Sequence, residues 1–383
     1  MKPSKVFSSN NPPSIKEDFN QFDYIIMSGD FEVALVKGDY VVKILNEPLC
    51  PIYLKRTKDF RGWLISRSID LHRTNSRVLR KALRLRNCDE IDLVLKVNAV
   101  TLTDNYWVKK YIDNLKWKDV YVNDDRLYNI ALNGLYEDVE GFVNTYELTN
   151  IGSYEKCWKI IDNKWCLIKT SKISEKFSEL FIEKLGVYFG YDMAKYFNYS
   201  DGFIGSIDFT ERKGPHIKFN YEPIHSLVGD DEDYYHVVEE LSKLENGWEL
   251  VSEYFKIIFM DAIVINPDRH LFNFGILRDP NNGNVLSLAP NFDNNLALIS
   301  RGYPSIPKST NPIIMDFVEI VDECPGMFVL PSLNEEVLER VVNDTIVDIG
   351  DSLDSNSIDK DFVIKFVMNN YKLVESKLNG REN

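Results

Sequence analysis

The chain reads Asn266-Pro-Asp-Arg-His-Leu-Phe-Asn-Phe-Gly275 in its second half, and Pro290-Asn-Phe-Asp293 follows after a short apolar segment. Two side chains of the first stretch, Asp268 and Asn273, stand five residues apart, and the second stretch ends on a carboxylate. The segment between them predicts a strand over 272–277, a turn over 278–283 and a returning strand over 285–288. A hairpin brings its open ends together, so we expect Asn273 and Asp293 to lie side by side, with Asp268 just upstream.

Oxygen ligands in this arrangement suit phosphoryl transfer. The spacing Asp-x-x-x-x-Asn is that of a protein-kinase catalytic loop, in which the Asp orients the attacking hydroxyl. An Asn and a later Asp can then hold Mg²⁺ on the nucleotide phosphates. The ordinary role of Asn and Asp in loops is to cap turns and helices. A kinase also needs a phosphate-covering turn, a lysine on the following strand and a helix glutamate to hold that lysine, all upstream of these residues. Their presence would favour the catalytic interpretation over simple capping.

Those three features occur in the required order. A turn at Gly152-Ser153 precedes a strand over 157–161, and glycine permits close backbone approach to phosphate. The next strand, 165–170, carries Lys169, which we predict contacts the nucleotide phosphates. A helix over 174–189 follows, with Ser174 as its expected N-cap. It carries Glu175, Glu179 and Glu183, of which we favour Glu179 as the partner of Lys169 and expect the others to be solvated. The run 202–210 is expected to supply the strand and hinge beneath an adenine ring.

The order of these segments predicts an α+β protein. We expect a bilobal, protein-kinase-like fold with a β-rich N-lobe and a mainly helical C-lobe, preceded by an additional N-terminal α/β region. The expected boundaries are 1–20 for a flexible tail, 21–140 for the accessory domain, 141–212 for the N-lobe and 213–383 for the C-lobe. At 383 residues the chain is long enough for this plan.

The motifs together resemble those of the HipA-like kinases, within the phosphatidylinositol-3/4-kinase-like protein kinases. The chain looks like a stand-alone or prophage-type relative of that family. The resemblance covers roughly 145–297 and rests on Gly152-Ser-Tyr-Glu-Lys156, a strand lysine, Asn266-x-Asp268-x-His270-x-x-Asn273-x-Gly275, and Leu288-Ala-Pro-x-Phe-Asp293.

The resemblance implies a serine/threonine protein kinase that uses ATP and Mg²⁺. Asp268 would be the catalytic carboxylate, with His270 bracing the loop, and Asn273 and Asp293 would be the metal ligands. Lys169, anchored by Glu179, would contact the nucleotide beside Gly152. HipA-like enzymes can phosphorylate a serine in their own phosphate loop and so inactivate themselves, and Ser153 lies in the corresponding segment. A toxin role with an antitoxin-like, DNA-binding partner follows by the same analogy.

Charge is unevenly distributed along the chain. The net charge is −14, yet the segment 55–86 holds 11 Lys and Arg against two Asp. The ordinary explanation is a helix, roughly 75–85, with a solvated basic face. A docking surface for nucleic acid or an acidic partner is the alternative. An alternative function is therefore a nucleotide-binding pseudokinase or an interaction module whose basic segment docks a partner. The complete set of Asp268, Asn273 and Asp293 argues against it, because a degenerate kinase usually lacks one of them.

The remaining composition excludes several classes of protein. No apolar run approaches the ~20 residues needed to cross a bilayer, and 1–17 does not resemble a signal peptide. We therefore expect no membrane partner. The five cysteines are dispersed, without a C-x-x-C pair, which favours reduced thiols and a cytoplasmic protein. The lack of a hydrophobic or polybasic segment beside the catalytic motifs makes protein a better expected substrate than lipid.

Overall fold

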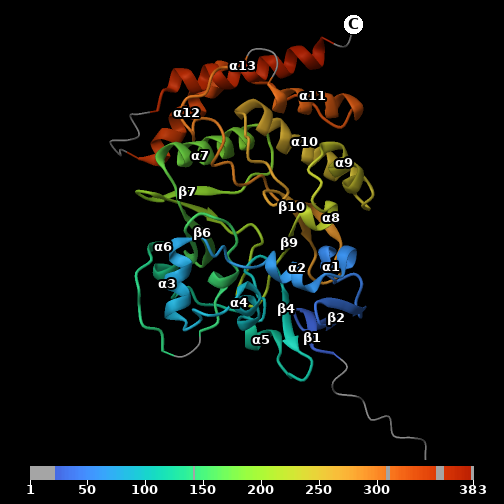
Figure 1. The fold of residues 1–383 in the computed structure, drawn as a ribbon. Helices are drawn as coiled ribbons and strands as arrows, with labels where there is room; N and C mark the ends of the chain where they lie inside the picture. The colour runs from blue at the N-terminus through green and yellow to red at the C-terminus, as the bar shows by residue number, and fades with distance from the viewer. Residues whose placement is uncertain (1–21, 141–142, 308–310, 351–357, 381–383) are drawn as a thin grey trace, which may run out of the picture.

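The computed structural model describes residues 22–140, 143–307, 311–350 and 358–380 (Figure 1). The expected tail, 1–20, lies outside the described residues, and so do 141–142, beside the expected boundary at residue 140. The N-terminal sheet is antiparallel, in the order β3-β2-β1-β4. Its strands are β1 (Tyr24–Ser28), β2 (Phe31–Lys37), β3 (Tyr40–Ile44) and β4 (Tyr106–Lys110).

Short helices pack around this sheet and along the segment that follows it. They are α1 (Ile52–Thr57), α2 (Phe60–Ile65), α3 (Thr74–Ala82), α4 (Glu90–Lys96), α5 (Trp117–Val120) and α6 (Tyr128–Asn133). The basic helix expected over 75–85 is α3. Leu79 and Ala82 face the core, while Arg77 and Lys81 are exposed, so its basic face is solvated as the simpler interpretation predicted.

A second antiparallel sheet follows a 3₁₀ turn, η1 (Tyr146–Thr149), in the order β5-β6-β8-β7. It contains β5 (Lys156–Ile161), β6 (Lys164–Thr170), β7 (Tyr196–Ser200) and β8 (Phe203–Ile207), with α7 (Ile173–Tyr188) between β6 and β7. Asp162 and Asn163 join β5 to β6 with φ angles of 48° and 61°, as a two-residue hairpin turn of this kind requires. The expected succession of a turn, a strand that carries Lys169 and a helix is thus present.

Ser174 is not the N-cap of α7, so that prediction was wrong. The helix begins two residues after Ser171, with Lys172 at the N-cap, and the Lys172 N–H donates to Glu175 Oε2 at 3.0 Å. Ser174 lies inside the first turn, where its hydroxyl donates to the carbonyl of Ser300 at 3.2 Å.

The third sheet contains the predicted hairpin. It is antiparallel, in the order β11-β10-β9, and contains β9 (Asn220–Pro223), β10 (Gly275–Arg278) and β11 (Val285–Leu288). The strand predicted over 272–277 begins only at Gly275, because Phe272 and Asn273 belong to the preceding loop. Gly275 pairs with Pro223, and a Cβ there would collide with the backbone of Glu222, so the site requires glycine.

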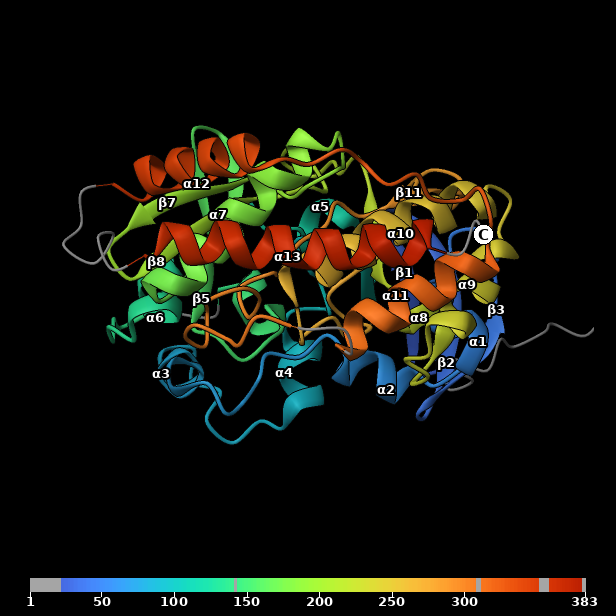
Figure 2. The same cartoon turned by 90° about the horizontal axis from the view of Figure 1, so that it is seen from above.

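Helices cover the side of the molecule away from the N-terminal sheet (Figures 1 and 2). The central one, α10 (Gly247–Val264), is apolar on most sides and is correspondingly buried, as expected of a core helix. The helix α13 (Lys360–Asn379) packs against α10, α11 and α12. The other helices of this part are α8 (His225–Val228), α9 (Tyr234–Ser242), α11 (Pro312–Glu323) and α12 (Glu335–Ile349).

A buried ion pair within the third sheet is hydrogen-bonded to the N-terminal region. The Arg278 guanidinium on β10 pairs with Glu222 on β9, and both side chains are almost fully buried. Glu222 also accepts hydrogen bonds from the Tyr106 hydroxyl at 2.9 Å and the Ile52 N–H at 2.8 Å. Removing either charge would leave the other buried and unpaired. The hydrogen bonds from Tyr106 and Ile52 to Glu222 hold the N-terminal region against the third sheet. No helix among the described residues is both long and apolar enough to span a membrane.

Candidate functional site

Lys169 links two carboxylates that lie far apart in the sequence. Its Nζ lies 2.6 Å from Glu179 Oε1 and 2.8 Å from Asp293 Oδ1. Glu179 is fully buried, whereas the Asp293 side chain is 37% exposed. Burial opposes the charge on Lys169, but the two carboxylates outweigh it and raise the pKa of the ammonium well above its usual value. The same contact lowers the pKa of Asp293 to about 2, against the effect of burial. Lys169 and Asp293 are therefore charged at neutral pH, whereas burial raises the pKa of the Glu179 carboxyl above its usual value.

The backbone around Asp293 ties this contact to its neighbours. Asp293 has a φ of 59°, in the left-handed region that Asp tolerates better than most residues. Its N–H donates to the Tyr196 hydroxyl at 2.9 Å, and the next N–H, of Asn294, donates to Glu179 Oε2 at 2.9 Å. Glu179 thus holds Lys169 with one oxygen and the Asp293 segment with the other.

The loop that carries Asp268 is closed by its own hydrogen bonds. The Asp268 carbonyl accepts from the His270 N–H and from Asn273 Nδ2, each at 2.9 Å, which leaves Asn273 Oδ1 as that side chain's acceptor. His270 Nδ1 accepts from the Phe272 N–H at 3.2 Å, a contact within the same loop. The Asp268 carboxylate makes no hydrogen bond to another described residue and is half-buried.

Arg269 organises this region, although the sequence analysis assigned it no role. Its guanidinium pairs with Asp261 at 2.8 Å and donates to the carbonyls of Asn273 at 2.6 Å and Phe292 at 2.9 Å. It also donates to the side-chain oxygens of Asn291 and Asn294. One buried arginine therefore holds the Asp268 loop against the Asp293 segment. Apart from the Asn273 carbonyl, these partners come from α10 and from beyond β11, so no local sequence pattern could have identified them.

A second lysine lies at the site, and the sequence analysis also missed it. Lys156 pairs with Lys169 across the β5–β6 hairpin, and directly paired residues project from the same face of a sheet. Burial lowers the pKa of the Lys156 ammonium to about 8. Counting back from the Asp162-Asn163 turn gives this pairing, so the register of the hairpin was the signal that could have found it.

The turn over 150–155, here called the phosphate turn, lies against Lys156. Gly152 has a φ of 106°, which side-chain-bearing residues rarely adopt, and a Cβ there would collide with Lys156 Nζ. Ser153 is exposed. The Tyr154 hydroxyl donates to Glu175 Oε1 at 3.4 Å, which connects the turn to the start of α7. The structure thus places Lys156 between the two predicted residues, Gly152 and Lys169.

Two glutamates of α7 depart from the expectation of solvated side chains. Glu175 is 6% exposed and caps its own helix through the Lys172 N–H. Glu183 is partly buried and accepts from the Tyr196 N–H at 3.0 Å. Both are satisfied by backbone groups, which spacing along a helix cannot reveal. Of the three, only Glu179 contacts Lys169.

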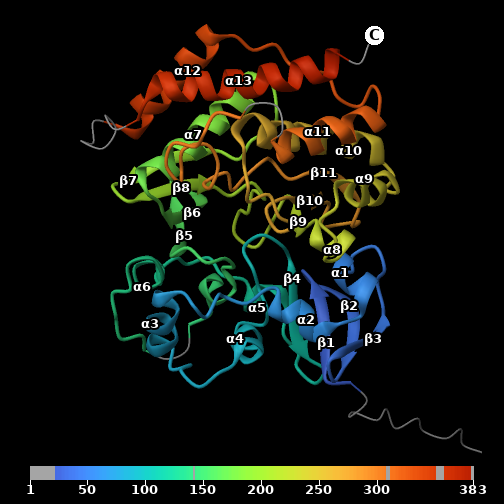
Figure 3. The same ribbon diagram turned by 45° about the horizontal axis from the view of Figure 1, so that its top comes forward.

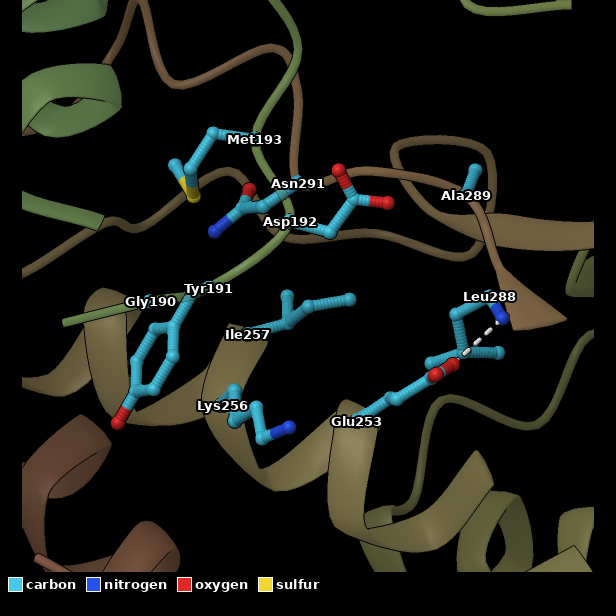
Figure 4. Close-up of a pocket in the computed structure, with 10 residues that line it drawn as sticks. All are labelled: Gly190, Tyr191, Asp192, Met193, Glu253, Lys256, Ile257, Leu288, Ala289 and Asn291. Atoms are coloured by element: carbon cyan, nitrogen blue, oxygen red, sulfur yellow. Dashed lines mark hydrogen bonds between the residues drawn. The ribbon is translucent and has the colours of Figure 1, made fainter. Parts of the chain in front are cut away.

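A cavity of about 150 Å³ lies elsewhere, where the loop after α7 meets α10 and the end of β11 (Figure 4). Its lining includes Asp192, Glu253 and Asn291 but none of the predicted site residues. In Figure 4 the dashed line marks the bond from the Leu288 N–H to Glu253, at 2.7 Å. Asn291 links the cavity to the site, because its side-chain oxygen accepts from Arg269 and its N–H donates to the Asp192 carbonyl at 2.9 Å.

The comparisons with known proteins concern the fold. No family model matches the chain, and neither does any curated protein. A solved structure of Shewanella oneidensis HipA, in complex with HipB and its operator DNA, matches with a TM-score of 0.56 and 12% sequence identity. That match covers 93% of this chain and 97% of the other, so it extends over most of the N-terminal region. The Helicobacter pylori proinflammatory kinase CtkA matches over 59% of this chain and 93% of its own, at 15% identity and a TM-score of 0.43. The chain has a mixed α/β fold that resembles HipA.

Proposed function

We propose that the chain is a serine/threonine protein kinase that uses ATP and Mg²⁺. The observation that carries the proposal is the contact of Lys169 with both Glu179 and Asp293. Phosphoryl transfer depends on positioning and charge stabilisation, and an ion pair between a strand lysine and a helix glutamate is one of its recurring parts. The likeness in fold to HipA supports the same class of activity. On this proposal, the sheet β5-β6-β8-β7 with α7 forms the N-lobe and the later helices form the C-lobe.

The residues present fit a magnesium ion bound together with a nucleotide. Mg²⁺ is usually held by one or two carboxylates together with substrate phosphates and water. The described residues contain no group of three His, Cys, Asp or Glu side chains that could hold a metal alone. Asn273 Oδ1 and Asp293 would instead complete a coordination shell that phosphates supply. When bound, the ion would neutralise charge on the phosphate oxygens.

Asp268 would act on the substrate hydroxyl. Its carboxylate is half-buried and makes no hydrogen bond to another described residue, so it is free to accept one from an incoming serine or threonine. The hydroxyl oxygen would form a bond to the γ-phosphorus as the bond from that phosphorus to the bridging β–γ oxygen breaks. The hydroxyl proton would pass to Asp268, and ADP would leave. Lys156 and Lys169 would bind the phosphates by charge.

Ser153 is the proposed site of self-modification. It is exposed, in the turn between Gly152 and Lys156. A phosphate there would add about −1.5 to −2 charges beside the two lysines that are to bind ATP. Modification and nucleotide binding would therefore compete. For a partner, the HipB and operator DNA of the HipA complex suggest an antitoxin-like or DNA-binding protein.

The test is transfer of radiolabelled γ-phosphate from ATP, with and without Mg²⁺, to the chain itself and to a serine-rich protein mixture. Transfer that needs Mg²⁺ and disappears in Asp268→Ala would support the proposal. Mg²⁺-dependent ATP binding without transfer to any protein would favour the nucleotide-binding module. That alternative has its own supporting observation in the exposed Arg77 and Lys81 on α3.

A further inference from the structure

The edge of strand β5 is covered by side chains instead of another strand. In the order β5-β6-β8-β7, β5 has only one neighbour, and its alternate residues turn their backbone groups outward. An uncovered edge is open to unwanted pairing. Here the Trp158 N–H donates to Glu147 at 2.7 Å, the Ile160 N–H donates to Asp125 at 2.9 Å, and the Lys156 carbonyl accepts from Arg73 at 2.8 Å. Arg73 and Asp125 belong to the N-terminal region.

Arg73 binds both ends of the phosphate turn. Its Nη1 donates to the Asn150 carbonyl at 2.9 Å and its Nη2 to the Lys156 carbonyl at 2.8 Å. The residue is only 3% exposed, at the start of α3. Glu155 Oε2 lies 3.6 Å from Arg73 Nε, and Glu155 Oε1 accepts from the Asn75 N–H at 3.1 Å. The turn therefore also contacts the first residues of α3.

The helix that carries Arg73 is itself fixed in place. Asn75 Nδ2 donates to the carbonyls of Ala131 at 3.2 Å and Leu132 at 2.8 Å, near the end of α6. The helix α6 packs on β5, and Figure 3 shows α3 and α6 side by side at that end of the sheet. Arg73 therefore projects from a supported position, and the turn between its two carbonyl contacts contains Gly152 and Ser153.

We propose that Arg73 is a positioning residue through which the N-terminal region sets the conformation of the phosphate turn before nucleotide binds. Holding a turn in its bound conformation removes an ordering cost that the ligand would otherwise meet. The effect on nucleotide rests on the proposed function, whereas the hold on the turn rests on the contacts alone. Arg73 touches no reacting atom, so its removal acts on affinity rather than on the chemical step.

The experiment uses the full chain as wild type, Arg73→Ala, Arg73→Lys and Arg77→Ala. Arg77 is the matched control, because it lies one turn further along α3 and is exposed. Backbone amide hydrogen exchange without nucleotide reports the turn directly. We expect faster exchange in 150–156 for Arg73→Ala, partial restoration in Arg73→Lys and none of this in Arg77→Ala. A lysine can reach one of the two carbonyls but cannot hold both as a fork does.

Steady-state kinetics supply the second measurement. For Arg73→Ala we expect KM for MgATP to rise about tenfold while kcat stays nearly constant, the pattern of a lost binding contribution. Unchanged exchange in 150–156 would overturn the proposal. Faster exchange throughout the N-terminal region, equal in the alanine and lysine variants, would also overturn it, since Arg73 would then only hold that region together.

A milder variant covers the case in which Arg73→Ala does not fold. Glu155→Gln keeps an acceptor for the Asn75 N–H but removes the charge beside Arg73, and we expect a smaller increase in exchange confined to the same turn. If exchange in the turn responds to these substitutions but the chain binds no nucleotide, the role of Arg73 in holding the turn stands and the proposed kinase function fails. The two proposals can thus fail separately.

Discussion

The Lys169 ammonium lies 2.6 Å from the Glu179 carboxylate, and this contact joins the β5–β6 hairpin to the helix α7. Glu179 has no exposed surface, so the pair excludes water from one side of the lysine. The other side of the lysine reaches Asp293. A single side chain therefore places the turn, the helix and the proposed metal ligand in one arrangement.

Replacing Glu179 by alanine should destabilise the protein and abolish activity. The change leaves a buried ammonium with one partner fewer and removes the acceptor of the Asn294 N–H. We expect a loss of about 3–5 kcal/mol in the free energy of unfolding, measured by urea denaturation. Glu183→Ala on the same helix is the control, and a loss there as large as in Glu179→Ala would argue against a special role for the pair.

Nucleotide affinity should depend on pH through Lys156. Its pKa is lowered to about 8 by burial, so in the free protein its ammonium is charged below pH 8 and loses its proton as the pH rises further. We expect the dissociation constant for ATP to increase between pH 7.5 and 9. Bound phosphates would favour the charged form, so binding near pH 8.5 should take up protons, as calorimetry in buffers of different ionisation enthalpy can detect.

Lys156→Arg provides the matched control for this dependence. A guanidinium stays charged over the whole range, so the variant should bind ATP with a flat profile. Identical pH profiles for the wild type and Lys156→Arg would show that Lys156 does not meet the phosphates.

Arg269 should be essential for stability as well as for the site. Arg269→Ala would leave the Asp261 carboxylate, 1% exposed, without its cation, and would free the carbonyls of Asn273 and Phe292. We expect about 3–5 kcal/mol lost on urea unfolding. Arg61→Ala, an exposed change, should stay within about 0.5 kcal/mol. Equal stabilities for the two variants would contradict the arrangement described.

Self-modification at Ser153 should inhibit the enzyme. Ser153→Asp places one negative charge in the turn beside Lys156, so we expect weaker ATP binding, with Ser153→Ala close to wild type. Mass spectrometry after incubation with MgATP locates the modified residue. Phosphate at other serines only, with Ser153→Asp as active as wild type, would remove this switch from the account.

Local patterns were sufficient where the site is built from neighbours in sequence. The contact of Glu179 with Lys169 followed from a strand, a helix and their order along the chain. The roles of Asp268 and Asn273 stay predictions from their spacing. The N-cap of α7 was misplaced because Lys172 caps through its backbone, which no residue type signals. Arg73 and Arg269 were beyond prediction because their partners are mostly backbone carbonyls and buried side chains in other elements. Those contacts exist only after the chain has folded.

The fold likeness extends further than the motifs did. The sequence resemblance covered roughly 145–297, whereas the HipA structure matches over 93% of the chain. Many charges of the basic segment 55–86 lie on solvated faces, and such charges tell nothing of the sheet beneath. Arg67 and Arg73 are instead buried, and the composition could not distinguish them from the exposed charges.

The most direct test of the central claim compares wild type with Asp268→Asn for γ-phosphate transfer and for MgATP binding. Asparagine keeps the size of the side chain but cannot accept the hydroxyl proton. We predict that transfer falls by about 10²–10⁴-fold while the dissociation constant for MgATP changes little. Transfer at the wild-type rate in Asp268→Asn would contradict the account, because the proposed catalytic carboxylate would then have no part in the reaction.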